Sequence, residues 1–242
     1  MRSLLVGFAS TFALYLPAQA FVTIVTTPSG QPLVGEGMIT ARTGVQEERF
    51  NNSTSTSTCV PPGGLGLDLV GVQGDTYDLA NDSVWHRRKA PALDSSCYLT
   101  VGAARKKDSL ELDFAGASSA TPLTYFGLYW GSIDEYNHIA FFNANGAVDF
   151  SGSLGQQLDG NTVASLMGVP LYSSNFVEFN LDPADHVTYA IISSDNYAFE
   201  LDNLAYTLAA VTPNLAAVPE AASAGVIAMG TLMVAFGRRR RR

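Results

Sequence analysis

Histidine, cysteine and basic residues are all scarce in this sequence of 242 residues. It has three histidines and two cysteines, and it contains no H-E-x-x-H, C-x-x-C or G-x-S-x-G motif and no phosphate-binding glycine loop. Asp134 and Glu135 are neighbours in a strand-like region, where adjacent side chains point apart, so they do not form a glycosidase pair. These absences remove the usual signs of catalysis, and we expect a protein that is not an enzyme.

The shortage of basic residues is greatest in the middle of the chain. Arg2, the five terminal arginines and Glu220 belong to the terminal segments, so the 14 basic and 22 acidic residues fall to 8 and 21, a net charge of about −13. Because nucleic acid requires a basic surface, we expect no nucleic-acid partner. Two basic triads, Arg87–Lys89 and Arg105–Lys107, could contact acidic polysaccharide or phosphate groups, or could simply be solvated loops.

The first twenty residues have the pattern of a secretory signal peptide. Arg2 gives a basic start, Leu4–Leu16 is apolar, and Ala18 and Ala20 form a small-x-small cleavage site for signal peptidase. We therefore expect the domain at residues 21–217 to be exported across the inner membrane.

The last segment, residues 218–242, has the pattern of a membrane anchor. Val218, Pro219 and Glu220 precede an apolar run from Ala221 to Phe236. Such a run would form a helix about 24 Å long, enough to span a thin bilayer. We predict a membrane helix at about residues 221–237, with the basic end on the cytoplasmic side. The basic end consists of Arg238, Arg239, Arg240, Arg241 and Arg242.

This C-terminal segment resembles the PEP-CTERM sorting signal of bacterial surface proteins, with Ala221 where that family usually has a second proline. The resemblance implies processing by an exosortase, which is a membrane-embedded cysteine protease. The protein would be held in the inner membrane transiently and then reach the cell surface, envelope or extracellular matrix, in association with exopolysaccharide. A permanently tail-anchored envelope protein is the alternative.

The exported domain has the pattern of an all-β protein. Strand-like runs alternate with turns rich in Gly, Asn, Asp and Ser, which favours a sandwich or barrel. Residues 42–64 show no periodicity and are predicted to be a long polar loop. One helix is expected at Thr162–Met167, capped by Asn161. The predicted strands include Phe21–Thr27, Gly66–Val72, Leu110–Phe114, Thr124–Trp130, Tyr136–Phe142 and Tyr197–Leu208.

A second resemblance covers Ser109–Tyr206. The phrases YFGLYWGSIDEYNHIAFF, NFVEFNL and NYAFELDNLAY are similar to a recurrent module of exosortase-dependent surface proteins. The resemblance implies a jelly-roll-like antiparallel β-sandwich.

Cys59 and Cys97 form an even pair, and an even pair in an oxidising compartment is more often bridged than free. We predict a disulfide that joins the Ser/Thr-rich segment to the strand near Cys97. Two free thiols are the alternative.

Two carboxylates in the strand Tyr197–Leu208 are candidate metal ligands. Strict alternation places Glu200 and Asp202 on one face together with Leu204, and Asp195 or Asn196 lies nearby. Carboxylate oxygens are preferred ligands of Ca²⁺, so a structural calcium site is one interpretation. Ordinary solvated carboxylates, with no cofactor, are the other.

Tyr125 and Tyr129 are candidate glycan contacts. Alternation along Thr124–Trp130 places both tyrosines on one face and Trp130 on the opposite, core-facing side. Exposed aromatic rings are used to stack on sugar rings, so a carbohydrate-binding module is a further alternative function.

Overall fold

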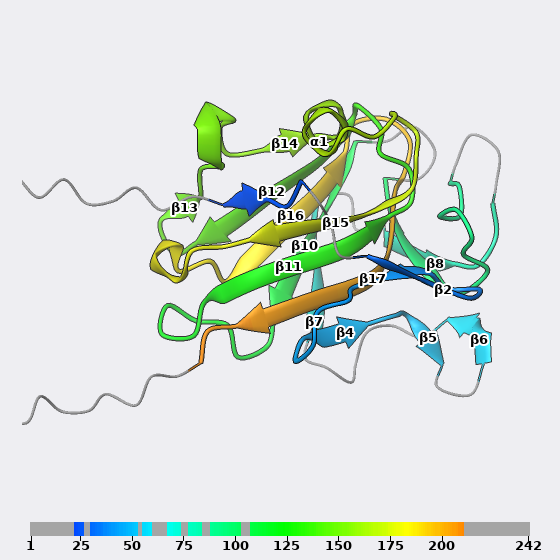
Figure 1. The fold of residues 1–242 in the computed structure, drawn as a ribbon, viewed down its shortest axis with the longest axis horizontal. Helices are drawn as coiled ribbons and strands as arrows, with labels where there is room; N and C mark the ends of the chain where they lie inside the picture. The colour runs from blue at the N-terminus through cyan, green and yellow to red at the C-terminus, as the bar shows by residue number, and fades with distance from the viewer. Residues whose placement is uncertain are drawn as a thin grey trace, which may run out of the picture. The chain divides into compact units, whose positions relative to one another are not determined.

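The structure is a computed structural model that describes residues 22–26, 30–52, 55–59, 67–73, 77–83, 88–102 and 107–210. In these ranges antiparallel strands form two main sheets that pack face to face (Figure 1). The predicted all-β sandwich is confirmed at this level. The predicted signal peptide and membrane helix lie outside the described residues, and within those residues no helix is long and apolar enough to cross a membrane.

The first sheet contains the longest strand and most of the buried polar groups discussed below. In spatial order it consists of β1 (Thr23–Ile24), β15 (Asn175–Asn180), β11 (Leu123–Trp130), β17 (Phe199–Leu208), β9 (Tyr98–Val101) and β8 (Tyr77–Ala80), with β4 (Gln46–Glu48) also paired to β17.

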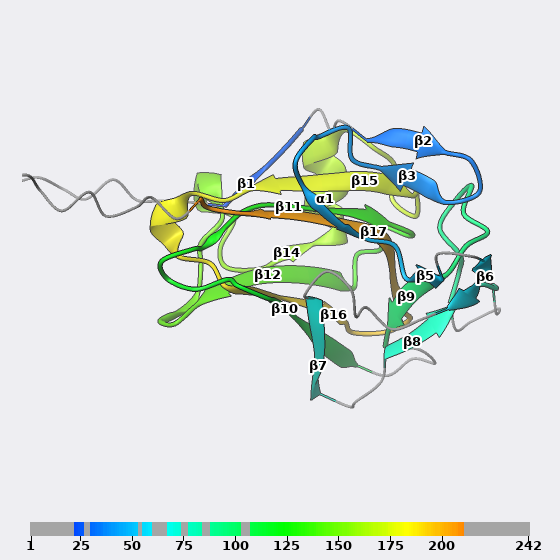
Figure 2. The ribbon, with the colours of Figure 1, turned by 90° about the horizontal axis from the view of Figure 1, so that it is seen from below.

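The second sheet lies against the first, as Figure 2 shows. In spatial order it consists of β13 (Gly146–Ala147), β12 (Asn137–Asn143), β16 (Tyr189–Ser194), β10 (Asp108–Phe114) and β7 (Leu67–Gln73), with β14 (Leu158–Asp159) also paired to β12.

Alternating sequence patterns explain how the sheets face the core. In β10 the residues Leu110, Leu112 and Phe114 are buried, while the acidic residues between them are half-buried, as the sequence predicts. Aromatic rings then join the two sheets. Phe141 of β12 lies 5.7 Å from Phe126 and 5.2 Å from Phe179, measured between ring centroids. These edge-to-face contacts fill the interior and fix the separation of the sheets.

Trp130 packs in the core, as predicted. Its side chain is fully buried, and its ring stacks on Phe199 with the ring centroids 4.3 Å apart.

The predicted loop at residues 42–64 contains short strands. β4 pairs with β17, and β5 (Asn51–Asn52) pairs with β6 (Ser55–Cys59). The loop prediction is therefore wrong for these parts of the segment. Short edge strands form through backbone hydrogen bonds, and a polar sequence without an apolar alternation does not reveal them. Another hairpin, β2 (Gln31–Leu33) and β3 (Gly37–Ile39), precedes this region.

The predicted helix is present but begins earlier. α1 spans Gly160–Met167, and its N-cap is Asp159, whose carboxylate accepts a hydrogen bond from Thr162 N at 2.7 Å. The predicted cap, Asn161, lies inside the helix. Gly160 is required at the first position because a Cβ atom there would lie 2.1 Å from the carbonyl oxygen of Asp134. Gly168 ends the helix in the left-handed conformation.

The predicted disulfide is present between Cys59 of β6 and Cys97, which lies just before β9. The two cysteines are 38 residues apart, and Cys97 is fully buried. The bridge thus ties the polar segment around β6 to the start of β9 in the first sheet.

Removing this bridge should destabilise the domain. A closed loop of this length corresponds to roughly 3–4 kcal/mol of stabilisation on the chain-entropy model. We expect the Cys59→Ser/Cys97→Ser variant to lose about that much free energy of unfolding in denaturant titrations, with no further effect of reductant. The unaltered protein should lose a similar amount on reduction. Equal stability of the oxidised and reduced proteins would contradict the expectation.

Candidate functional site

An extra residue in β17 creates the most distinctive local structure. Gly127 of β11 pairs with Ala205 of β17, and Tyr129 pairs with Asp202. The step is two residues in β11 but three residues in β17. Asn203 occupies this bulge with φ of 50°, the left-handed region that asparagine tolerates better than most residues.

The bulge changes which side chains of β17 face the core. Phe199, Leu201, Leu204 and Tyr206 are all in the main hydrophobic cluster. The prediction that Leu204 shares a face with Glu200 and Asp202 is therefore wrong. The interval of three between the apolar residues 201 and 204, in place of two, is the sequence signal for this bulge.

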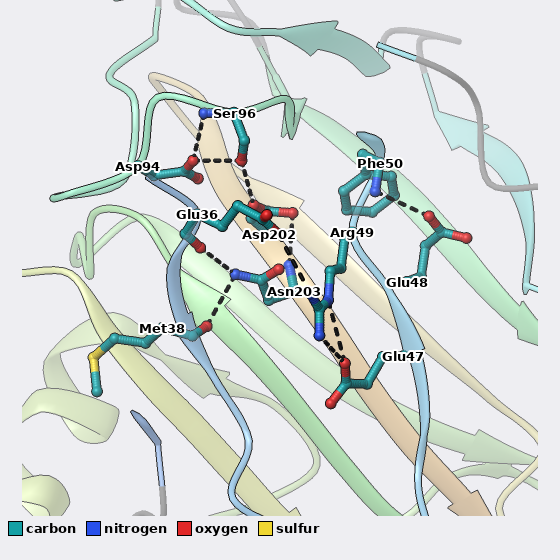
Figure 3. Close-up of polar contacts among 10 residues, drawn as sticks. All are labelled: Glu36, Met38, Glu47, Glu48, Arg49, Phe50, Asp94, Ser96, Asp202 and Asn203. Carbon is teal, nitrogen blue, oxygen red and sulfur yellow. Dashed lines mark hydrogen bonds and ion pairs between the residues drawn. The ribbon is translucent and has the colours of Figure 1, made fainter. Parts of the chain in front are cut away.

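Asp202 is paired with a second buried carboxyl group. Asp94 Oδ1 accepts hydrogen bonds from Ser96 N at 2.8 Å and Ser96 Oγ at 2.5 Å, and the same hydroxyl is 3.3 Å from Asp202 Oδ2 (Figure 3). Asp202 is fully buried and Asp94 is 8% exposed. Burial raises the pKa of Asp202 well above its ordinary value, and the nearby Asp94 carboxyl raises it further. Burial and the neighbouring carboxyl group thus both favour the protonated form of Asp202.

Asn203 attaches the segment that covers this pair. We call residues 30–50 the N-terminal cover. Asn203 Nδ2 donates hydrogen bonds to the carbonyl oxygens of Glu36 at 2.5 Å and Met38 at 3.0 Å (Figure 3). Between them, Gly37 has φ of 71°, and a Cβ atom there would lie 2.1 Å from the Tyr129 ring. Only glycine fits at this position.

Arg49 supplies a positive charge beside the acidic groups. Its guanidinium donates to Glu47 Oε2, with Nη2 at 2.6 Å, and lies 3.5 Å from Glu36 Oε2 (Figure 3). Burial lowers the pKa of Arg49, but Glu47, Glu36 and Asp202 outweigh that effect and the net pKa is raised. Arg49 is therefore a permanent cation that joins two parts of the cover, Glu36 before β3 and Glu47 in β4.

The N-terminal cover buries the two tyrosines predicted as glycan contacts. Tyr125 is 3% exposed and Tyr129 is 1% exposed, and both belong to a small cluster with Phe176. The Tyr125 hydroxyl contacts Glu178 at 2.9 Å, and the Arg42 guanidinium lies 4.1 Å from its ring centroid. The predicted glycan contacts at Tyr125 and Tyr129 are therefore wrong. The two residues do share the face away from the core, but the cover occupies that face.

Glu200 lies in a second acidic environment on the same strand. Its Oε1 accepts a hydrogen bond from Lys89 N at 2.8 Å, while the buried Oε2 has no hydrogen-bond partner. Burial raises the pKa of Glu200 to about 8, with Asp134 contributing. Burial also raises the pKa of Asp134, to about 6.

Within the described residues, Glu200 and Asp202 are not grouped with a third side chain that could complete the predicted calcium site. Glu200 is held by Lys89 N and Asp202 by Ser96 and Asn203, while Asp195 pairs with Lys107 at 2.8 Å. Across the described ranges no three histidine, cysteine or acidic residues are grouped to hold a metal ion. Each of the two carboxyl groups has a backbone N–H donor from the protein.

The other polar residues singled out from the sequence lie apart from this site. Asp134 is buried, whereas the exposed Glu135 accepts a hydrogen bond from Tyr172 at 3.1 Å. Of the basic triads, Arg87, Arg105 and Lys106 lie outside the described residues, and Arg88 pairs with Asp82 at 2.7 Å.

The residues that sequence reasoning missed are Asp94, Ser96 and Asn203. Ser96 and Asp94 are remote from β17 in sequence, so only the tertiary structure brings them together. Together these residues position a segment of the chain over β17.

The buried carboxyl groups predict that stability falls as pH rises. The folded state binds the proton of Glu200 more tightly than the unfolded chain does. The contribution of this proton to stability is complete below about pH 4.5, and it is lost as the pH rises to about 8. The free energy of unfolding should therefore fall with pH in this window, and we expect Glu200→Gln to reduce that fall by roughly 1.4 kcal/mol per pH unit. Glu135→Gln, the same change at an exposed residue, is the control. Parallel pH profiles for all three proteins in denaturant titrations would contradict the assignment.

Two substitutions of Asn203 separate the effect of its hydrogen bonds from the effect of its backbone conformation. Asn203→Gly keeps the left-handed backbone accessible but removes two hydrogen bonds to the cover, so we expect a loss of about 1–3 kcal/mol. Asn203→Ala should lose roughly 1 kcal/mol more because it adds the left-handed strain. Denaturant unfolding measures both, and limited proteolysis should cut residues 30–50 faster in both variants. Wild-type stability of Asn203→Gly would show that the side chain does not hold the cover.

Comparison with known proteins adds no identification. No protein-family model matches the chain, and no curated protein matches it either. The residues that carry the resemblance to a sorting signal, from Val218 to Arg242, lie outside the described part of the chain.

Proposed function

We propose that this protein is an exported, non-enzymatic component of the cell surface or extracellular matrix, sorted by exosortase-type processing of residues 218–242. The observation that carries the proposal is the disulfide between Cys59 and Cys97. Disulfides persist in oxidising compartments and are rare in the cytosol. Both cysteines of the chain are used in this bridge, which agrees with the secretory pattern of residues 1–20.

The polar groups of the site support a structural role. Asp202, Glu178 and Glu200 are buried, yet their hydrogen-bond donors are backbone amides or side chains that hold neighbouring segments in place. Such groups stabilise one arrangement of the chain because breaking it would leave a buried carboxyl group without a partner. In this proposal the sandwich is a jelly-roll-like module that is stable outside the cell.

The C-terminal segment supplies the sorting step. The helix at about residues 221–237 would hold the exported domain in the inner membrane until the protease acts near Glu220. Release would then deliver it to the envelope or to exopolysaccharide. A permanently tail-anchored protein is the competing proposal, since it needs the same apolar run and basic end.

Fractionation of the native host, followed by intact mass measurement, tests sorting. We expect a mature form that begins near Phe21, ends near Glu220 and is found outside the inner membrane. Replacing Arg238–Arg242 by glutamine should trap or mislocalise the precursor, whereas lysine at the same positions, which keeps the charge, is the matched control. A full-length C-terminus in the inner membrane of the unaltered protein would instead favour the tail anchor, and Ala221→Pro would then test whether the missing proline is the reason.

A further inference from the structure

Three loops meet beside the end of β11. They precede β9, follow β11 and follow α1, and they consist of residues 88–95, 131–136 and 168–174. Ser174 joins all three, because its Oγ accepts a hydrogen bond from Ala92 N at 2.9 Å and donates one to the carbonyl oxygen of Gly131. Pro91 packs closely on Gly131, where a Cβ atom would lie 2.8 Å from Pro91 Cγ. The three loops therefore form one packed unit, which we call the loop end.

The loop end presents an exposed tyrosine ring in a fixed position. Tyr172 is 57% exposed, and among the described residues no second aromatic ring stacks on it. Its backbone N donates a hydrogen bond to Ile133 O at 3.0 Å, and its hydroxyl donates to Glu135 Oε2 at 3.1 Å. Its φ of 63° is in the left-handed region, which is uncommon for a bulky residue. The ring is thus held at its backbone and at its hydroxyl while its surface remains open to solvent.

Polar groups of both kinds lie near this ring. Glu135 is exposed, and across the described ranges its second oxygen, Oε1, makes no hydrogen bond or ion pair. That oxygen is free to accept a hydrogen bond. Burial raises the pKa of Asp134 to about 6, and the exposed Lys89 partly opposes this increase, so the Lys89 ammonium lies near Asp134 and Glu135. The loop end therefore combines an apolar ring with an acceptor and a donor.

Other exposed apolar residues lie on the neighbouring turns. Leu93 is 80% exposed in the first loop, and Val34 is fully exposed in the turn between β2 and β3. This turn is attached to the first loop by a hydrogen bond of 2.9 Å from Ser95 N to Gly35 O. Within the described ranges, Val34, Leu93 and Tyr172 are the large apolar residues that are exposed. Their concentration in connected loops, in place of scattered positions, is typical of a binding surface.

We propose that the loop end binds a pyranose ring of a neutral polysaccharide. The sugar packs its C–H groups on the Tyr172 ring, donates a hydroxyl hydrogen bond to Glu135 and accepts one from Lys89, while Leu93 extends the apolar surface. Sugar hydroxyl groups both donate and accept, which matches this pair of charged residues. The net charge of about −13 repels an acidic polysaccharide. A purely apolar partner would remove water from Glu135 and Lys89 without giving hydrogen bonds in return.

This site deepens the proposed function, on which it rests only for bringing the protein to polysaccharide outside the cell. The tyrosines predicted from the sequence as glycan contacts, Tyr125 and Tyr129, are under the N-terminal cover, whereas Tyr172 is exposed on a loop. The aromatic surface is therefore assigned to the loop after α1 and not to a strand of the first sheet.

Affinity electrophoresis of the protein from its native host tests the site. The gels contain dextran, galactomannan or glycol chitin as neutral polysaccharides, and alginate as the acidic one. We expect at least one neutral polysaccharide to retard the protein and alginate to leave its mobility unchanged. Tyr172→Ala should raise the dissociation constant about tenfold because the stacking surface is lost, while Tyr172→Phe, which keeps the ring, should retain most of the binding. Tyr189→Ala, at a half-buried tyrosine of β16 in the second sheet, is the control and should leave binding unchanged.

Glu135→Gln tests the hydrogen-bond acceptor without removing a ring. It replaces a charged acceptor by a neutral one and should raise the dissociation constant several-fold, with an unaltered melting temperature because the residue is exposed. Glu111→Gln, the same change on β10, is its control and should not affect binding.

Three results would each overturn the proposal. They are lack of retardation by every neutral polysaccharide, retardation by alginate, and equal effects of Tyr172→Ala and Tyr189→Ala on binding. The site and the sorting step can fail separately. Binding by a protein that is not processed would refute sorting alone, and correct processing without binding would refute this site alone.

Discussion

The bulge at Asn203 is the constraint on which the described architecture depends. One additional residue in β17 lets Leu201 and Leu204 both enter the core while Asp202 remains on the opposite side. The same residue, in its left-handed conformation, directs its side chain to the carbonyl groups of Glu36 and Met38. A local irregularity of one strand thereby attaches the N-terminal cover to the first sheet and buries Tyr125 and Tyr129 beneath it.

The cover has an electrostatic consequence. A carboxyl group deprived of water is stable only if it is paired, hydrogen-bonded or protonated. Glu178 pairs with Arg42, whereas Asp202 meets another carboxyl group, Asp94, across the hydroxyl of Ser96. In the first arrangement an arginine faces the carboxyl group, whereas in the second the pKa of Asp202 is raised. The acidic composition of the domain is thus partly internal, with Asp94, Glu178 and Asp202 buried.

Sequence reasoning predicted the regular parts of the fold and missed the irregular ones. Alternation identified β10 and β11 because each has one side in the core, and the even cysteine count indicated the bridge. It failed at Asn203, because a strict period of two does not allow for a bulge. It also failed at Tyr125 and Tyr129, since alternation shows which residues share a face but not which distant segment covers that face. For the same reason, the sequence pattern did not indicate that Asp94 lies beside Asp202.

The central claim is that the bulge holds the cover over Asp202, and that this burial raises the pKa of the Asp202 carboxyl group. The most direct measurement is the carboxyl ¹³C chemical shift of Asp202, followed by NMR from about pH 4 to about pH 9. The account predicts that the Asp202 carboxyl group ionises well above the ordinary pKa of an aspartate, together with changes in the ring signals of Tyr129. Ionisation of Asp202 at the ordinary pKa of an aspartate, with the Tyr129 signals unchanged, would contradict it.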